Sequence, residues 1–241
     1  MSQSFRVAPT IHFGYGVSEQ AGAQVQSLGV ARVLVVTDAG VRAAGISGQI
    51  EASLAASGIE FEIYDQVSPN PRDYECLAAA ELARAIGAEA IVAVGGGSPI
   101  DAAKAIAALA ANPGDIYDYL EVIGRGKALT NPSWPCIAIP TTAGTGSEVT
   151  RNAVLAAPEH RVKVSLRSPL MLPSIALVDP ELTYTLPPAI TASTGLDALT
   201  QLIEPFVSVK ANPLTDAICR EGIRHAAQSL RRAYENGADQ E

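Results

Sequence analysis

The apolar residues of the chain fall into short runs rich in β-branched residues, separated by alanine-rich stretches of helical length. Such runs are typical of buried strands, and alanine-rich stretches favour helices. Their alternation is the pattern of βαβ units with a mostly parallel sheet. The pattern predicts strands at residues 33–36, 61–64, 90–94, 137–139 and 175–178, and helices at 40–57, 73–86 and 99–111.

The pattern changes towards the end of the chain. Residues 153–155 and 162–164 flank the turn-prone segment 158–160, which predicts a hairpin. After Pro187-Pro188 the strand pattern fades, and residues 189–234 read as helices interrupted at Asn212-Pro213. We therefore predict an α/β fold with two domains: a Rossmann-like parallel-sheet domain at 1–184, followed by the start of an all-helical domain at 185–241, which we expect to be truncated.

Composition narrows the class of protein. The net charge is −8, from 17 basic and 25 acidic residues, and the basic residues are scattered, which argues against a nucleic-acid partner. No apolar run approaches the ~18 residues of a membrane span, and the N-terminus lacks a signal core. The three cysteines form no CxxC pair, which favours reduced thiols, and Cys136 reads as a core residue. We expect a soluble, cytoplasmic protein.

A glycine-rich motif follows the predicted strand at 90–94. Gly95–Gly97 let a backbone approach a ligand closely, while Ser98, Pro99 and Asp101 suit the N-cap and the first and third positions of a helix. The N–H groups and dipole of that helix would favour a diphosphate, although a capped turn without a ligand has the same pattern. Ile100 stands where the usual dinucleotide fingerprint has its third glycine.

Two further motifs follow in order. Pro140–Thr150 reads Pro-Thr-Thr-Ala-Gly-Thr-Gly-Ser-Glu-Val-Thr and comes directly after a predicted strand, where open α/β sheets bind ligands; Gly195–Leu199 reads Gly-Leu-Asp-Ala-Leu. Together with Gly95–Lys104, these motifs resemble the iron-containing alcohol dehydrogenase family, a relative of glycerol dehydrogenases and dehydroquinate synthase. The resemblance extends over nearly the whole chain and implies a nucleotide-binding first domain.

The resemblance also implies cofactor contacts. Asp38 would accept hydrogen bonds from the adenosine ribose, which favours NAD over NADP, although a helix N-cap is also a sound role for it. Asn70, Lys163 and Leu182 would lie near the cofactor, yet each suits an ordinary surface or packing position equally well. The complete set of expected cofactor-binding residues is Asp38, Asn70, Gly96, Gly97, Ser98, Asp101, Thr141, Thr142, Thr145, Ser147, Lys163 and Leu182.

The metal site departs from the family pattern. The family pairs an aspartate with a histidine four residues later, but here Asp197 is followed by Gln201, whose amide is a poor ligand for Fe(II) or Zn(II). His12, His160 and His225 match no ligand position. Asp197 is thus the one candidate metal ligand. Either the chain is truncated, or it belongs to a metal-independent branch like maleylacetate reductase, in which hydrogen-bond donors stabilise the alkoxide.

These observations favour an NAD(P)-dependent oxidoreductase that moves hydride between the nicotinamide and a small alcohol, aldehyde or keto acid. Asp197, Gln201 and Lys163 would line the reaction site, and we expect a homodimer, which is common in such enzymes. A nucleotide-binding fragment or regulatory protein without turnover is the alternative that the short helical region and Gln201 suggest. A dehydroquinate synthase-like lyase is a third reading, which Gln201 and the sparse cations disfavour.

Overall fold

The computed structural model describes residues 10–112 and 114–240, which divide into two compact units. The first contains the described residues up to Thr141 together with Ser147–Asp179. The second contains Thr142–Gly146 and the described residues from Pro180 onwards. The change of unit after Asp179 lies close to the predicted domain change at residue 185. Within the described residues, no helix is both long and apolar enough to span a membrane.

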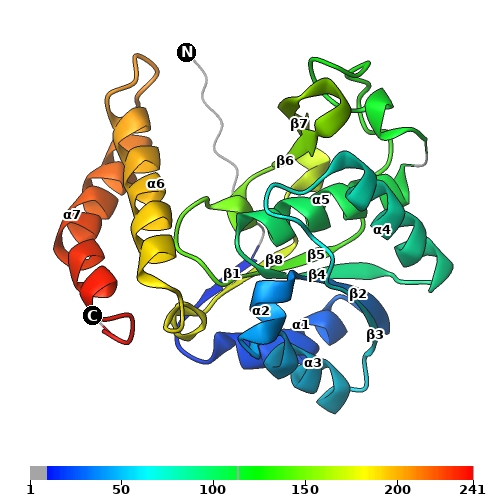
Figure 1. The fold of residues 1–241 in the computed structure, drawn as a ribbon, viewed down its shortest axis with the longest axis horizontal. Helices are drawn as coiled ribbons and strands as arrows, with labels where there is room; N and C mark the ends of the chain where they lie inside the picture. Colours follow the sequence, from blue (N-terminus) through cyan, green and yellow to red (C-terminus); the bar gives the residue numbers. More distant parts are fainter. Residues whose placement is uncertain (1–9, 113, 241) are drawn as a thin grey trace. The chain divides into compact units, whose positions relative to one another are not determined.

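The first unit is built on a six-stranded sheet in which every neighbouring pair of strands is parallel (Figure 1). The strand order is β1-β8-β5-β4-β2-β3. All five predicted strands of the sheet are confirmed, and the parallel α/β class with them. The strands are β1 Thr10–Phe13, β2 Arg32–Val36, β3 Glu60–Tyr64, β4 Ala90–Gly95, β5 Cys136–Pro140 and β8 Ile175–Val178.

The sheet is covered by helices on both faces, with α4 and α5 on one face and α1, α2 and α3 on the other (Figure 1). Successive residues of β2 point to opposite faces of the sheet. Leu34 and Val36 belong to the core beneath α4 and α5. Val33 and Val35 are also buried and point to the opposite face. The helices are α1 Ala21–Ser27, α2 Ala39–Ala43, α3 Ile46–Ala56, α4 Asp73–Ala85 and α5 Gly97–Ala111.

Two features of this unit differ from the sequence prediction. The helix predicted at 40–57 is two helices, because Gly45 between α2 and α3 adopts a left-handed conformation with φ of 77°. The edge strand β1 was not predicted, since Thr-Ile-His-Phe is short and remains largely exposed. Cys136, expected in the core, is buried in β5, and burial raises the pKa of its thiol to about 12.

The predicted hairpin is present as the antiparallel pair β6 (Asn152–Ala157) and β7 (Val162–Arg167). Its buried residues Leu155 and Leu166 join the core on the α4–α5 side of the sheet. Short 3-10 helices complete the connections of the chain: η1 Val17–Gln20, η2 Ile116–Asp118, η3 Ser147–Val149, η4 Pro158–His160, η5 Pro169–Met171 and η6 Pro180–Thr183.

The second unit consists mainly of α6 (Pro188–Phe206) and α7 (Pro213–Glu235), which lie side by side (Figure 1). The predicted interruption of the helices at Asn212-Pro213 is confirmed, because α7 begins at Pro213. Asn212 caps this helix by accepting a hydrogen bond from the Thr215 N–H at 3.1 Å. Gly195 allows close packing, since a Cβ there would overlap the Leu230 side chain.

Candidate functional site

The turn between β4 and α5 places a helix N-terminus at the carboxyl edge of the sheet. Gly95 ends the strand with φ of 150°, and its carbonyl accepts a hydrogen bond from the Thr141 N–H at 3.0 Å. Gly96 is extended and is the N-cap of α5, with no side-chain cap. The glycine N-cap of α5 thus supplies no capping side chain to the first N–H groups of the helix, an arrangement suited to binding anions at helix starts.

The predicted capping box at Ser98 and Asp101 was wrong. The helix begins two residues earlier than expected, because glycine at the N-cap adopts the extended conformation and lets the helix start at Gly97. Both side chains are consequently used elsewhere. The Ser98 hydroxyl accepts a hydrogen bond from the Asn70 N–H at 3.1 Å, and the Asp101 carboxylate faces the segment after residue 146.

Three of the predicted cofactor-binding residues meet beside this helix start. Asn70 lies in a loop after β3 with φ of 58°, a conformation that asparagine tolerates better than most residues. Its amide oxygen accepts a hydrogen bond of 2.5 Å from the Lys163 Nζ on β7, while its N–H donates to Ser98. An ammonium has three N–H donors, so the exposed Lys163 keeps donors for a ligand.

Asp38 lies two residues after the end of β2 and caps α2. One carboxylate oxygen accepts a hydrogen bond from the Val41 N–H at 2.9 Å, which confirms the capping role that its position suggested. The side chain is only half-buried, so its second oxygen can accept a further hydrogen bond. Its contact with a ribose stays a prediction.

The predicted loop Thr141–Ser147 is divided between the two units. Thr141 and Ser147 are buried in the first unit, where Thr141 is held by Gly95. Thr142 and Thr145 belong to the second unit, as does Leu182, which is buried in η6.

A buried polar cluster further along α5 was not predicted from the sequence. The Lys104 ammonium pairs with the Asp101 carboxylate at 3.0 Å and donates to the Ser147 carbonyl and the Thr150 hydroxyl. Burial lowers the pKa of Lys104, against the attraction of Asp101. The available signal was the Asp-xx-Lys spacing, which puts two charges on one face of a helix in which most other residues are buried and apolar.

Glu148 adjoins this cluster, and burial raises the pKa of its carboxyl group. The folded state thus binds a proton more tightly than the unfolded state, so Glu148 costs stability as pH rises above its ordinary value of ~4.3. We expect Glu148→Gln to raise the free energy of unfolding by up to about 1 kcal/mol at pH 7 and to leave it unchanged at pH 3. Urea unfolding at both pH values measures the difference.

The exposed Glu204 on α6 supplies the matched control for this measurement. Glu204→Gln should leave the free energy of unfolding unchanged at both pH values, because the carboxylate is already solvated. A Glu148→Gln variant that is less stable than the wild type at pH 7 would contradict the sign of the effect.

The predicted catalytic pair lies on one face of α6 in the second unit. The Gln201 amide donates a hydrogen bond of 3.0 Å to the Asp197 carboxylate, and both residues are solvent-accessible. His225 on α7 pairs instead with Glu221 at 3.0 Å. Among residues 10–112 and 114–240, no group of three His, Cys, Asp or Glu side chains is placed to hold a metal ion. The described residues therefore do not make up a complete metal site by themselves.

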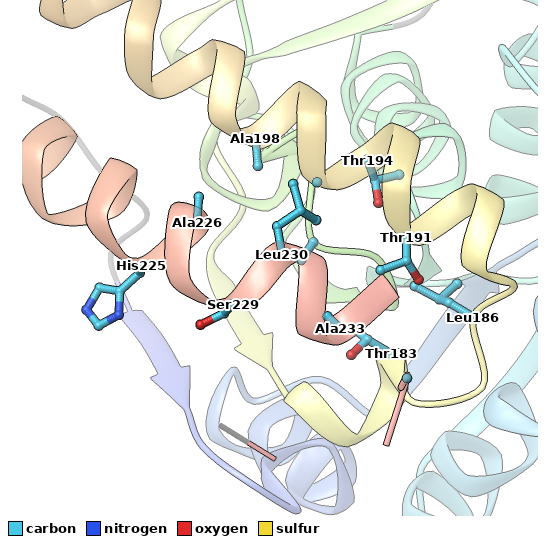
Figure 2. Close-up of a pocket in the computed structure, with 13 residues that line it drawn as sticks. Thr183, Leu186, Thr191, Thr194, Ala198, His225, Ala226, Ser229, Leu230 and Ala233 are labelled. Atoms are coloured by element: carbon cyan, nitrogen blue, oxygen red, sulfur yellow. The ribbon is translucent and has the colours of Figure 1, made fainter. Parts of the chain in front are cut away.

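The second unit also contains a cavity of about 300 Å³ (Figure 2). Ala198, Ala226 and Leu230 give it an apolar lining, to which Thr191 and Thr194 add hydroxyl groups. The described residues that line it do not include Asp197 or Gln201. The cavity is thus separate from the predicted catalytic pair.

Comparison with known proteins agrees with the resemblance seen in the motifs. The family model for iron-containing alcohol dehydrogenase matches residues 8–180, and the model for the C-terminal part of the Fe-containing alcohol dehydrogenase family matches residues 191–241. Alcohol dehydrogenase 4 of Saccharomyces cerevisiae is 40% identical over 235 residues, which are 98% of this chain and 60% of that protein. The chain thus spans about 60% of the length of such relatives.

Solved structures show the same similarity. A crystal structure of 1,3-propanediol oxidoreductase has a TM-score of 0.94 and 40% identity, and the match covers 99% of this chain and 62% of that one. A sulfoacetaldehyde reductase from Bifidobacterium kashiwanohense, in complex with NAD+, has a TM-score of 0.91 and 35% identity, over 98% of this chain and 61% of that one. The extent of these matches establishes that the chain belongs to the iron-containing alcohol dehydrogenase family.

Proposed function

We propose that the chain binds NAD and is the cofactor-binding part of an oxidoreductase that transfers hydride between the nicotinamide and a small alcohol or aldehyde. The observation that carries the proposal is the start of α5 at the carboxyl edge of a parallel sheet, where the N-cap Gly96 supplies no capping side chain. The similar structure that contains NAD+ and the relatives named as dehydrogenases support it.

Different groups of the first unit bind different parts of the cofactor. The α5 N–H groups bind the diphosphate, and the free oxygen of Asp38 accepts hydrogen bonds from the adenosine ribose. Lys163, held by Asn70, donates a hydrogen bond near the reacting end of the ligand. The bound nicotinamide supplies the hydride chemistry, while the protein sets position and charge.

Asp197 and Gln201 are proposed to line the reaction site in the second unit. Gln201 keeps one amide N–H beyond the one donated to Asp197, and that group suits a substrate oxygen. A homodimer and a cytoplasmic location remain predictions, which light scattering of the purified protein and cell fractionation would check.

Titration of the purified chain with NADH, followed by the cofactor's fluorescence, tests the proposal at its first step. We expect saturable binding that is stronger for NADH than for NADPH. Absence of binding by either cofactor would refute the proposed function. If the chain binds NADH but does not oxidise it with any aldehyde or keto acid as substrate, the alternative of a nucleotide-binding protein without turnover is favoured.

The role of Asp38 is tested by Asp38→Ser, because serine retains the cap but not the charge. We expect stability within a few tenths of a kcal/mol of the wild type, since serine and aspartate cap equally well. Affinity for NADH should fall by about tenfold, the effect of losing ~1.4 kcal/mol of charged hydrogen bonding, while the preference over NADPH narrows. Fluorescence titrations with both cofactors measure this.

The control for Asp38 is Asp115, an exposed aspartate that caps η2 through the Tyr117 N–H. Asp115→Ser changes the same atoms at another cap and should leave both affinities unchanged. Equal affinity of the wild type and Asp38→Ser for NADH would limit Asp38 to its capping role.

A further inference from the structure

Lys104 is a lysine whose side chain has no exposed surface. It lies within α5, where its sequence neighbours Ala102, Ala103, Ala105 and Ile106 are all buried in the core. An ammonium ion loses its hydration in such a place, and few lysines are fully buried unless they are paired.

The ammonium group and its partner Asp101 tie α5 to the segment that ends the Thr141–Thr150 loop. Lys104 Nζ donates to the Ser147 carbonyl at 2.9 Å and to the Thr150 hydroxyl at 3.0 Å. Asp101 accepts a hydrogen bond from the Ser147 hydroxyl through one oxygen and from the Val154 N–H, at 3.0 Å, through the other. The two charged residues therefore hold one continuous stretch, from the end of the loop into β6.

These contacts connect the first two of the three sequence motifs. Asp101 and Lys104 come from Gly95–Lys104, and Ser147 and Thr150 come from Pro140–Thr150. The start of the second motif is fixed independently by the Thr141 N–H bond to the Gly95 carbonyl. Both ends of the loop are thus attached to the turn and helix that begin at Gly95.

Stability alone is a weak reason for this arrangement. A buried ion pair is often no more stabilising than apolar side chains of similar volume, because desolvation offsets the attraction. The lowered pKa of Lys104 agrees with that balance, since burial outweighs the opposing effect of Asp101. Apolar side chains would not reproduce the directed hydrogen bonds to Ser147, Thr150 and Val154.

We propose that Lys104 is a positioning residue, which with Asp101 fixes the Ser147–Thr150 turn against α5 so that the rim of the diphosphate site is ordered before the ligand binds. The proposal rests on the proposed binding of NAD. Ordering the rim in advance removes a cost that binding would otherwise bear. Lys104 itself touches no ligand, because its three donors are used within the protein.

The test compares three variants with the wild-type chain. Lys104→Met removes the ammonium alone, and the double variant Asp101→Asn/Lys104→Met also removes the carboxylate that would otherwise be left unpaired. Lys127→Met is the matched control, since Lys127 makes an exposed ion pair with Asp118. For each, affinities for NADH, ADP and adenosine are measured by calorimetry or ligand-observed NMR, well below the melting temperature.

We expect the double variant to lose about tenfold in affinity for NADH and ADP and to keep its affinity for adenosine, which lacks phosphate. Lys127→Met should match the wild type. A purely structural role would lower the melting temperature without changing the affinity of the folded protein, and that result would overturn the proposal. Equal losses for adenosine and ADP would overturn it as well.

Failure of NADH binding and failure of the Lys104 role give different results. A wild-type chain that binds no NADH refutes the proposed function, whereas a wild type that binds normally beside an unchanged double variant refutes only the role of Lys104. Should Lys104→Met fail to fold because Asp101 is left buried and unpaired, the double variant still decides the question.

Discussion

Replacing Gly95 with alanine is expected to lower the free energy of unfolding by about 3 kcal/mol. A Cβ at this position would lie 2.5 Å from Cγ and 2.9 Å from Cβ of Pro99, and φ of 150° is strained for any residue with a side chain. To relieve either the contact with Pro99 or the backbone strain, the turn before α5 must move, and the start of the helix moves with it. Affinity for NADH should therefore fall by at least about tenfold in the folded variant.

Urea unfolding and NADH titration measure the two effects of Gly95→Ala. A double-mutant cycle with Pro99→Ala, which removes the proline Cγ, separates the contribution of the steric clash from that of the backbone strain. We expect Pro99→Ala to restore part of the stability and to leave the backbone strain in place. A Gly95→Ala protein with wild-type stability and affinity would show that this turn tolerates a side chain.

Gly22→Ala is expected to cost about 3 kcal/mol by a different route, because α1 and α3 approach too closely for a side chain there. An alanine Cβ would overlap the Ser53 carbonyl oxygen and lie 2.7 Å from the Ser57 Cβ. The Gly22 N–H also donates to the Ser53 hydroxyl at 3.0 Å, so a shift of α1 breaks a hydrogen bond as well. Chemical denaturation followed by circular dichroism gives the loss.

Gly48 in α3 provides the opposite result as a control. A Cβ at Gly48 meets no atom within 4 Å, and alanine favours the helix over glycine. Gly48→Ala should therefore raise the free energy of unfolding by up to about 1 kcal/mol. If both substitutions shifted stability in the same direction, the packing explanation for Gly22 would fail.

Patterns that recur within a few residues predicted the elements of this fold well. The apolar runs identified the inner strands β2, β4, β5 and β8, because burial on both faces of a parallel sheet requires nearly continuous apolar sequence. The fifth predicted strand, β3, is a partly buried edge strand, and its aromatic and β-branched residues identified it. The first strand escaped prediction because it is an exposed edge, and the break at Gly45 escaped because glycine is also found within helices.

The site was predictable in part for the same reason. The glycine motif indicated a helix start at a sheet edge, but the choice of Gly96 over Ser98 as the N-cap depends on what else each side chain contacts. Two partners of Lys104, Ser147 and Thr150, lie 43 and 46 residues away along the chain. The local Asp-xx-Lys spacing could therefore reveal only its pair with Asp101. A lysine in an alanine-rich helix would ordinarily be placed on the solvent side.

The position of β1 in the sheet has a consequence for synthesis of the protein. This strand is among the first parts of the described chain to leave the ribosome, yet its one neighbour in the sheet is β8, which comes last of the six. Four inner and far-edge strands can assemble while β1 waits without a partner. The sheet is therefore completed only after Val178 has emerged, which makes closure of this edge a late, long-range step in folding.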